Sequence, residues 1–521
     1  MRPGCGAGDW VHGGCQMRGH KEWTVPISIN PYWFCSLKQS YRAIITMFLQ
    51  LPLALLSGAL VGSVSAETIL GVTVYSRHGD RTSKHYKGYM LTNLGLQQNF
   101  QVGSDYRDLY VSSDSAKQIL GISEEKYVPA QVFASAPDEA VLLNTATAFL
   151  QGLYPPLESL DEQTASQTLN NGSTYINPLN GYQYVVLHGE EEESPDTIWI
   201  KGDDECPAIS VLAENFAESA VYQDRVESTR SFYQQFWPIL QDVFDYTTEA
   251  NMSYKNAFDI FDLINTGTIH NASLEDAVTE EEMFQLRTLA DSHEFDSNFN
   301  ASQPEMAIGA RTLSQAILSH LNETITSQGK TKFSFLAGSY DTMMAFAGLL
   351  DLTAASADFF GLPVYASTMA FELLTEGNVT EFPSETDDLK VRFLFRNGSD
   401  GGAPLTAFPL FGGEQVTLSW SEFATKMQDR AIATVAEWCE ICGSEQGFCT
   451  AETASEADAS AKGKSGGGMS NAVAGVIGAF VTLGVVGIVA GLAFVMLKKR
   501  RTAAPVREIG TAEKGTGSIS S

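Results

Sequence analysis

A buried-strand pattern, Ile69–Ser76 (ILGVTVYS), runs directly into the polar run Arg77-His78-Gly79-Asp80-Arg81. The first part is apolar, small or β-branched, which predicts a strand buried on both faces. The second part brings two guanidinium groups and an imidazole to the carboxyl end of that strand, where ligands bind in α/β sheets. Paired arginines hold phosphate or sulfate oxygens, and a neutral imidazole beside them can attack phosphorus. The pattern therefore favours an anion site over an ordinary basic loop.

Strand and helix patterns alternate beyond this loop. The later strands are expected at 131–135, 182–188, 197–200, 332–339, 389–397 and 405–411. The helices are expected at 91–110, from 137 towards 153, from about 341 and at 419–441, with a mostly helical, polar cap at 209–330. Such alternation predicts the α/β class, as a three-layer, mostly parallel sheet with helices on both faces.

Several blocks resemble one enzyme family. Arg77-His78-Gly79-Asp80-Arg81 is similar to the RHGxRxP signature of the histidine acid phosphatases, the phytase-containing branch of the phosphoglycerate-mutase-like superfamily. Weaker likenesses to later blocks are Leu91-Thr92-x-x-Gly95-x-x-Gln98, Gly152-Leu-Tyr-Pro-Pro156, Tyr365-Ala-Ser and Phe371-Glu-Leu373. The resemblance spans residues 67–449. It implies the phosphoglycerate-mutase-like fold and two-step hydrolysis of a small phosphomonoester, with neither metal nor cofactor.

The resemblance also implies roles for individual residues. His78 would be the catalytic nucleophile that forms a phosphohistidine, with Asp341 as the catalytic proton donor. Arg77 and Arg81 would bind the phosphate.

Three positions depart from the family pattern. Ser135 stands where a third phosphate-binding arginine is expected, and Tyr340 replaces a phosphate-binding histidine. Ser83 replaces the proline of the signature, which is a smaller change. Each lost charge-assisted contact costs about 1.5–3 kcal/mol, so the first two changes predict slower turnover. Tyr340 and Ser135 remain candidates for the pocket.

Two apolar segments predict the topology. Residues 47–66 read as a signal peptide, with an uncleaved anchor as the alternative, after a leader of doubtful role at 1–46. Residues 472–497 carry no charge and are followed by Lys498-Lys499-Arg500-Arg501, which predicts a single C-terminal transmembrane helix. Residues 450–471 would then be a stalk and 498–521 a cytoplasmic tail, in a type I membrane protein of the secretory pathway. Gly487 and Gly491 are compatible with a weak homodimer, although glycine is common in such helices.

Composition and cysteine usage agree with that compartment. The 521 residues carry a net charge of −29, which argues against a nucleic-acid partner. Seven sequons predict glycosylation at Asn171, Asn251, Asn271, Asn300, Asn322, Asn378 and Asn397. Four cysteines follow the leader and signal, namely Cys206, Cys439, Cys442 and Cys449. Two disulfides of undetermined pairing are favoured over a zinc or redox pair at Cys439 and Cys442.

Two functions of different class remain. The first is a membrane-anchored acid phosphatase with its catalytic domain outside the cytosol. The second is a catalytically weak or inactive surface glycoprotein that binds an anion or a partner. Ser135 and Tyr340 favour the second, whereas the retained Arg77, His78 and Asp341 favour the first.

Overall fold

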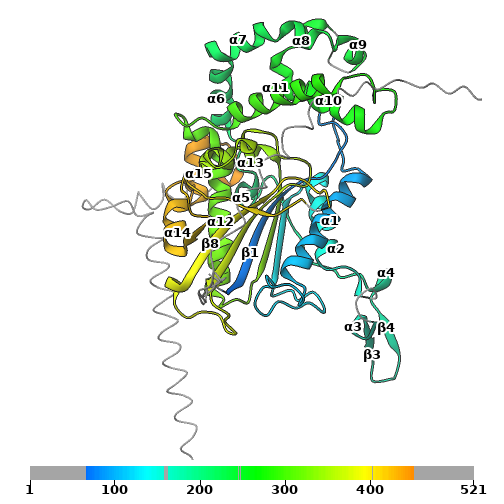
Figure 1. Cartoon of the computed structure of the whole chain (residues 1–521), viewed down its shortest axis with the longest axis vertical. Helices are drawn as coiled ribbons and strands as arrows, with labels where there is room; N and C mark the ends of the chain where they lie inside the picture. Colours follow the sequence, from blue (N-terminus) through cyan, green and yellow to red (C-terminus); the bar gives the residue numbers. More distant parts are fainter. Residues whose placement is uncertain (1–65, 158–161, 244–245, 247, 402, 451–521) are drawn as a thin grey trace, which may run out of the picture. The chain divides into compact units, whose positions relative to one another are not determined.

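A mixed β-sheet forms the centre of the protein (Figure 1). The computed structural model describes residues 66–157, 162–243, 246, 248–401 and 403–450. The strands run in the order β10-β8-β7-β1-β6-β2-β5, and β9 pairs with β8. Their bounds are β1 (Glu67–Arg77), β2 (Val132–Pro137), β5 (His188–Glu190), β6 (Phe333–Gly338), β7 (Thr368–Glu376), β8 (Leu389–Arg396), β9 (Thr406–Ala407) and β10 (Thr417–Ser419).

The expectation of a mostly parallel sheet is wrong, because only one half of the sheet is parallel. β1, β6, β2 and β5 pair in parallel, whereas β7 pairs antiparallel with both β1 and β8. The chain enters β7 at the carboxyl end of β1, where the Arg77 amide donates to the Ser367 carbonyl (2.9 Å). A strand that starts there must run backwards along β1, and the connection from β7 to β8 contains no crossover helix.

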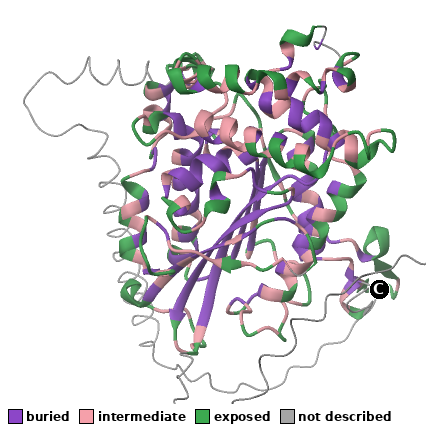
Figure 2. Cartoon of the chain, turned by 45° about the horizontal axis from the view of Figure 1, so that its top comes forward, coloured by how far each residue is buried: buried purple, intermediate pink, exposed green. Residues whose placement is uncertain are grey.

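Helices cover both faces of the sheet, as expected (Figure 1). One face is covered by α1 (Asn93–Tyr110) and α2 (Ala140–Leu153), which pack on Val72, Val74 and Phe335. The other is covered by α12 (Ile308–Thr326), α13 (Tyr340–Leu349) and α14 (Trp420–Gln428). Figure 2 shows the long strands buried along most of their length and the helices exposed on their outer sides.

A helical cap follows β5 in the sequence and has a core of its own. Its helices are α6 (Pro207–Ala217), α7 (Ala220–Ser228), α8 (Arg230–Gln234), α9 (Trp237–Leu240), α10 (Ala257–His270) and α11 (Glu280–Asn298). Its apolar cluster includes Tyr233, Tyr254 and Ile260, and it reaches Tyr340 at the start of α13. α12, at the end of the range expected for the cap, packs on the sheet instead.

The remaining elements are short. They are α3 (Glu162–Ala165), β3 (Ser166–Thr168), β4 (Thr174–Ile176), α4 (Pro178–Gly181), α5 (Ile198–Lys201), α15 (Val435–Cys442), and the 3₁₀ turns η2 (Glu249–Asn251), η3 (Tyr254–Asn256), η4 (Pro304–Ala307), η5 (Leu352–Ala354), η6 (Ala357–Phe360) and η7 (Thr386–Asp388).

Four local expectations need correction. Of the strand expected at 405–411, only residues 406–407 form a strand, β9. Residues 197–200, expected as a strand, contribute to the helical turn α5, because a four-residue apolar run does not distinguish the two states. Of the strand expected at 182–188, only residue 188 belongs to β5. The helix expected at 419–441 is interrupted between α14 and α15, since the Ile432 amide bonds to Arg311 of α12 and Thr434 caps a new helix.

The four cysteines form two disulfides, and the structure decides their pairing. Cys206 is bonded to Cys442, and Cys439 to Cys449. The alternative of a zinc or redox pair at Cys439 and Cys442 is therefore wrong. The first disulfide joins the start of α6 to the end of α15, so it fixes the entrance of the cap to the helices beside the sheet.

The signal peptide expected at 47–66 lies outside the described residues except for its last position. The leader at 1–46, the stalk at 450–471 after its first residue, the transmembrane helix at 472–497 and the tail at 498–521 also lie outside them. Within the part of the chain that the structure does describe, no helix has the length and apolar character to cross a bilayer.

The crossing of α1 and α2 depends on Gly152. A Cβ atom at this position would lie 2.1 Å from the Phe100 carbonyl oxygen. Gly152→Ala should therefore lower the free energy of unfolding by about 2 kcal/mol, although alanine is the better helix former. Chemical denaturation measures this change. Gly447→Ala is the control, because nothing lies within 4 Å of a Cβ there; an equal effect of both substitutions would contradict the packing argument.

Candidate active site

The loop Arg77–Arg81 lies where the predicted anion site was expected, at the carboxyl end of β1. The parallel register pairs Arg77 with Gly338 of β6, so the residues after β6 begin beside the loop. Tyr340 and Asp341, which open α13, are brought to the same edge of the sheet. Ser135 lies near the carboxyl end of β2, the next strand beyond β6.

The start of α1 holds this loop in place. Thr92 caps α1 and donates its hydroxyl proton to the Asp80 carboxylate, while Gln98 accepts from the Asp80 amide (2.7 Å). A Cβ on Gly79 would lie 2.3 Å from the Gly95 carbonyl oxygen, so the loop and the helix approach as closely as two backbones can. The segment Thr92-x-x-Gly95-x-x-Gln98 therefore holds the loop Arg77–Arg81 in position.

Both arginines of the loop are buried with unused donors. Arg77 is 6% exposed and Arg81 fully buried. Arg77 Nη1 donates to the Pro363 carbonyl, and its guanidinium lies 4.7 Å from the centre of the Tyr365 ring. Nε of Arg77, and Nε and Nη2 of Arg81, have no hydrogen-bond partner. Buried charged donors without partners are costly, so this arrangement indicates a place for an anion.

The arginines keep their charge at ordinary pH. Burial lowers the pKa of Arg77 to about 10, which still leaves it protonated below neutral pH. Burial is the largest single influence on Arg81 and acts to lower its pKa, but the charge and hydrogen bond of Asp262, together with Tyr365 and Tyr340, outweigh it and raise that pKa. The site therefore holds two fixed positive charges.

His78 is held as a neutral imidazole with a free nitrogen. Burial, followed by the positive charges of Arg77 and Arg81, holds the pKa of His78 well below its usual value. Its Nδ1 lies 2.8 Å from the Gly79 carbonyl oxygen, which can only accept, so Nδ1 carries the proton. The lone pair is then on Nε2, as a nucleophile attacking phosphorus requires.

The segment before β7 completes the support of His78. The Ala366 amide donates to the His78 carbonyl (3.0 Å), and the Tyr365 ring lies 5.7 Å from the imidazole, centre to centre. Ala366 has a positive φ of 61°. The antiparallel direction of β7 thus has a local consequence, because it brings the segment Tyr365-Ala-Ser to His78.

Asp262 of the cap is a site residue that the sequence analysis missed. Its carboxylate accepts from Arg81 Nη1 (3.0 and 3.1 Å), from the Ser83 hydroxyl (2.8 Å) and from the Lys84 amide (2.8 Å). Ser83, which stands in place of the signature proline, is thus part of the connection between loop and cap. The available signal was one of two aspartates, Asp259 and Asp262, within the otherwise apolar run Ala257–Ile264.

The two departures from the family pattern are each bound to a carboxylate. Ser135 donates its hydroxyl proton to Glu190 of β5 (2.6 Å). The Tyr340 hydroxyl donates to Glu294 of α11 (2.8 Å), and its ring lies 5.1 Å from the Arg77 guanidinium. Neither hydroxyl proton is free for a phosphate oxygen. Glu190 and Glu294 come from elements remote in sequence, and no local pattern indicates them.

Asp341 lies in the first turn of α13, where its Oδ1 accepts from the Thr342 amide (2.8 Å). A second carboxylate, Asp203 in the loop between α5 and α6, interacts with it electrostatically. Burial, then the charges of Asp341 and Asp204, raise the pKa of Asp203 to about 7. Its Oδ1 is buried with no hydrogen-bond partner.

Two further features can be examined outside this site, namely the predicted glycosylation sites and possible metal ligands. None of the seven sequon asparagines is buried. No group of three or more His, Cys, Asp or Glu side chains in the described residues is arranged to hold a metal ion.

Comparison with known proteins identifies the family. The model of the histidine phosphatase superfamily (branch 2) matches residues 84–396. The chain belongs to this superfamily. The matched range begins after Arg81. The family assignment therefore rests on the remainder of the domain and is independent of the motif Arg77–Arg81. The resemblance to the histidine acid phosphatases is confirmed, and the relatives support a phosphatase.

The relatives are distant but cover most of the domain. The chain is 24% identical to lysosomal acid phosphatase of Xenopus laevis over 400 residues, covering 73% of this chain and 80% of the relative. It is 22% identical to prostatic acid phosphatase of Homo sapiens over 390 residues, covering 69% and 88%. A solved structure, the phytase of Citrobacter braakii, covers 70% of this chain and 98% of its own at 14% identity, with a TM-score of 0.46.

The buried pair of Arg81 and Asp262 should be essential for stability. Asp262→Asn leaves the guanidinium, which is fully buried, without its counter-charge, so we expect a loss of about 3–5 kcal/mol in unfolding free energy. Chemical denaturation measures it. Asp296→Asn is the matched control, since its pair with Arg225 is about one third exposed and should cost less than about 1 kcal/mol. Equal losses would contradict the role assigned to Asp262.

Asp203 should make stability depend on pH. Between its ordinary pKa and about 7, the folded chain binds a proton that the unfolded chain releases, so its contribution to stability falls as pH rises through this interval. Asp203→Asn removes this contribution. The melting temperature of the variant relative to wild type should therefore increase from pH 4.5 to 7.5. The exposed Asp276→Asn is the control; parallel profiles for both variants would refute the assignment.

Proposed function

We propose that the protein hydrolyses small phosphomonoesters through a phosphohistidine on His78. The observation that carries this proposal is the neutral imidazole between two buried arginines with unused donors. A phosphoryl group supplies the oxygens that Arg77 Nε and Arg81 Nε and Nη2 lack. The names of the relatives, lysosomal and prostatic acid phosphatase, support the same reaction class.

In the first step, His78 Nε2 forms a bond to phosphorus while the ester P–O bond breaks. The two guanidinium groups hold the oxygens as negative charge develops on them. Asp341 gives its proton to the departing alkoxide, so that a neutral alcohol leaves. The Gly79 carbonyl keeps the proton of the imidazole on Nδ1 and stabilises the positive charge that develops on the ring.

In the second step, water attacks the phosphohistidine. Asp341, now a carboxylate, accepts the proton of the water, and the P–N bond breaks to release phosphate and regenerate neutral His78. The residues therefore complete a cycle with neither metal nor cofactor.

A second candidate function is anion binding with little or no turnover. The contacts of Ser135 with Glu190 and of Tyr340 with Glu294 favour it, because both lost phosphate ligands are replaced by groups already bound to carboxylates. Carboxylates so close to the site would repel a phosphate group. Acid pH would weaken this repulsion by protonating carboxylates, which is consistent with an acid phosphatase.

For the location, we propose the secretory or lysosomal pathway, with the phosphatase domain outside the cytosol and anchored by residues 472–497. Two disulfides and seven unburied sequons support an oxidising compartment. The names of the relatives support the same pathway.

The decisive experiment is phosphate release from an aryl phosphate by the full-length protein across pH 3–8. His78→Ala should reduce turnover by at least about 10³-fold, since the covalent route is lost. His320→Ala, which removes a partly buried imidazole outside the loop Arg77–Arg81, should retain activity. Quenching the wild type in alkaline denaturant should trap a phosphoenzyme that is then lost in acid, and the His78 variant should not form it.

Identical rates for wild type and His78→Ala in folded preparations would contradict the phosphatase proposal. Calorimetric titration with inorganic phosphate then tests the second candidate, which requires binding that depends on Arg77 and Arg81.

A further inference from the structure

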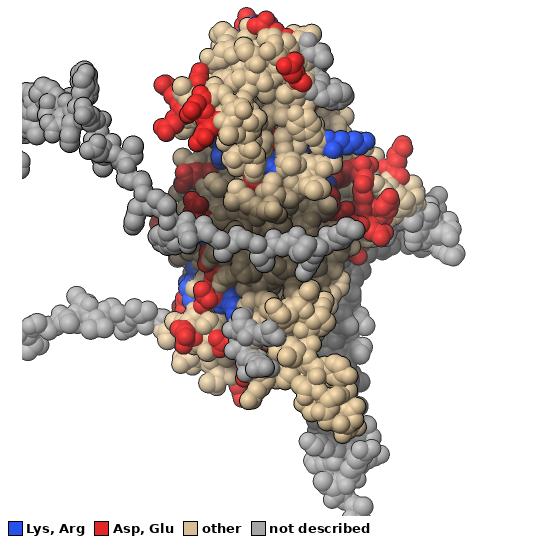
Figure 3. Space-filling model, turned by 90° about the vertical axis from the view of Figure 1, so that its right-hand side faces the viewer, with Lys and Arg blue, Asp and Glu red and all other residues tan. Residues whose placement is uncertain are grey.

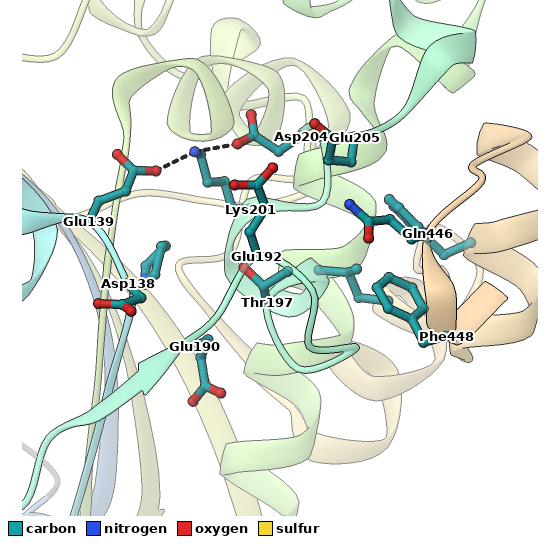
Figure 4. A pocket seen from close by; sticks show the side chains of 13 residues that line it. Asp138, Glu139, Glu190, Glu192, Thr197, Lys201, Asp204, Glu205, Gln446 and Phe448 are labelled. Atoms are coloured by element: carbon teal, nitrogen blue, oxygen red, sulfur yellow. Dashed lines mark hydrogen bonds and ion pairs between the residues drawn. The ribbon is translucent and has the colours of Figure 1, made fainter. Parts of the chain in front are cut away.

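A hollow opens beside the carboxyl ends of β2 and β5, with an empty volume of about 440 Å³ (Figure 4). Pro137, Ile198, Trp438 and Phe448 give it apolar walls. Six carboxylates line the remainder: Asp138, Glu139, Glu190, Glu192, Asp204 and Glu205. Figure 4 shows Asp138, Glu139 and Glu190 on the side of the hollow opposite Gln446 and Phe448.

One cation lines the hollow, and its charge is already balanced. The Lys201 ammonium contacts both Glu139 and Asp204. Asp138, Glu190, Glu192 and Glu205 form no ion pair with any described residue. The hollow therefore has an excess of negative charge. Acidic side chains are also prominent on the face of the molecule drawn in Figure 3. The neighbouring carboxylates add to the effect of burial in raising the pKa of Glu192.

Three connections make this hollow the neighbour of the phosphate site. Glu190 accepts the Ser135 hydroxyl proton (2.6 Å). Glu139 accepts from Tyr89 (3.4 Å), whose ring lies 5.5 Å from the Arg81 guanidinium. Asp204 follows Asp203, which interacts with the proton donor Asp341. The hollow thus adjoins the site on the side where Ser135, Tyr89 and Asp203 lie.

The acidic wall is held rigidly. The Trp438 indole N–H donates to the Gly202 carbonyl (2.8 Å), and the Cys206–Cys442 disulfide fixes the other end of the loop 202–206. This loop carries Asp204 and Glu205, so their positions are set before any ligand binds. A pre-formed wall of this kind costs little ordering entropy on binding.

The ligand suggested by these two adjoining regions carries both signs of charge. Acidic residues alone would only be solvated, but the buried, unpartnered donors of Arg77 and Arg81 next to them indicate an anion. We propose that the substrate is a phosphomonoester of an aminoalcohol, with its phosphate at Arg77, His78 and Arg81 and its ammonium group in the hollow. This inference rests on the phosphatase function proposed above.

The expected preference for an ammonium group is electrostatic, and the same charges disfavour substrates with a second phosphate. An ammonium group gains from the carboxylates of the hollow. A second phosphate on the alcohol would instead be repelled by them. An inositol polyphosphate is therefore expected to be a poor substrate.

The test compares kcat/KM for phosphoethanolamine and glycerol 3-phosphate with the full-length protein. Both release phosphate from a primary alcohol, but only the first carries an ammonium group. The wild type should prefer phosphoethanolamine by about tenfold, and Glu192→Gln/Glu205→Gln should remove most of this preference. Glu381→Gln/Glu385→Gln, which removes two exposed carboxylates elsewhere, should keep it. Added salt should reduce the preference of the wild type.

The outcomes separate this inference from the phosphatase function. If aryl phosphate is hydrolysed but phosphoethanolamine is not preferred, or the preference survives in Glu192→Gln/Glu205→Gln, the inference is overturned and the phosphatase stands. If the chain hydrolyses nothing, calorimetric binding replaces turnover. Tighter binding of phosphoethanolamine than of glycerol 3-phosphate, lost in the same variant, supports the hollow; equal binding, or none, overturns it.

Discussion

Burying Arg77 and Arg81 together, beside a neutral histidine, is the constraint on which the rest of this structure depends. Two like charges out of water are unfavourable unless other groups compensate them. The protein supplies part of the compensation through the Pro363 carbonyl, the Tyr365 ring and the Asp262 carboxylate. It leaves three guanidinium donors without partners, and that remainder is what an anion would satisfy.

Elements from three parts of the chain contact the loop Arg77–Arg81 and hold it in place. α1 supports it from the sheet side through Thr92 and Gln98, and the antiparallel β7 brings Tyr365 and Ala366 to it. The cap contributes Asp262 from α10. Three regions far apart in sequence therefore converge on one short segment, and disturbing the cap would disturb the electrostatics around His78.

The chain places negative charge close to the candidate phosphate site. Glu190 and Glu294 bind Ser135 and Tyr340, and further carboxylates line the adjoining hollow. These carboxylates act in one direction, because each makes a polyanionic ligand less favourable near the phosphate site. The same charges favour the positively charged substrate proposed above.

The sequence by itself determined what depends on contiguous residues. β1, its motif and the alternation of strands and helices are local patterns, so they predicted the α/β class, the nucleophile and the two arginines. Which cysteines pair, which way β7 runs, and whether 419–441 is one helix depend on contacts between distant segments, and only the tertiary structure decided them. The same holds for Asp262, Glu190 and Glu294. Each is defined by its contact with a residue that lies far away in the chain, and a local pattern carries no signal for such contacts.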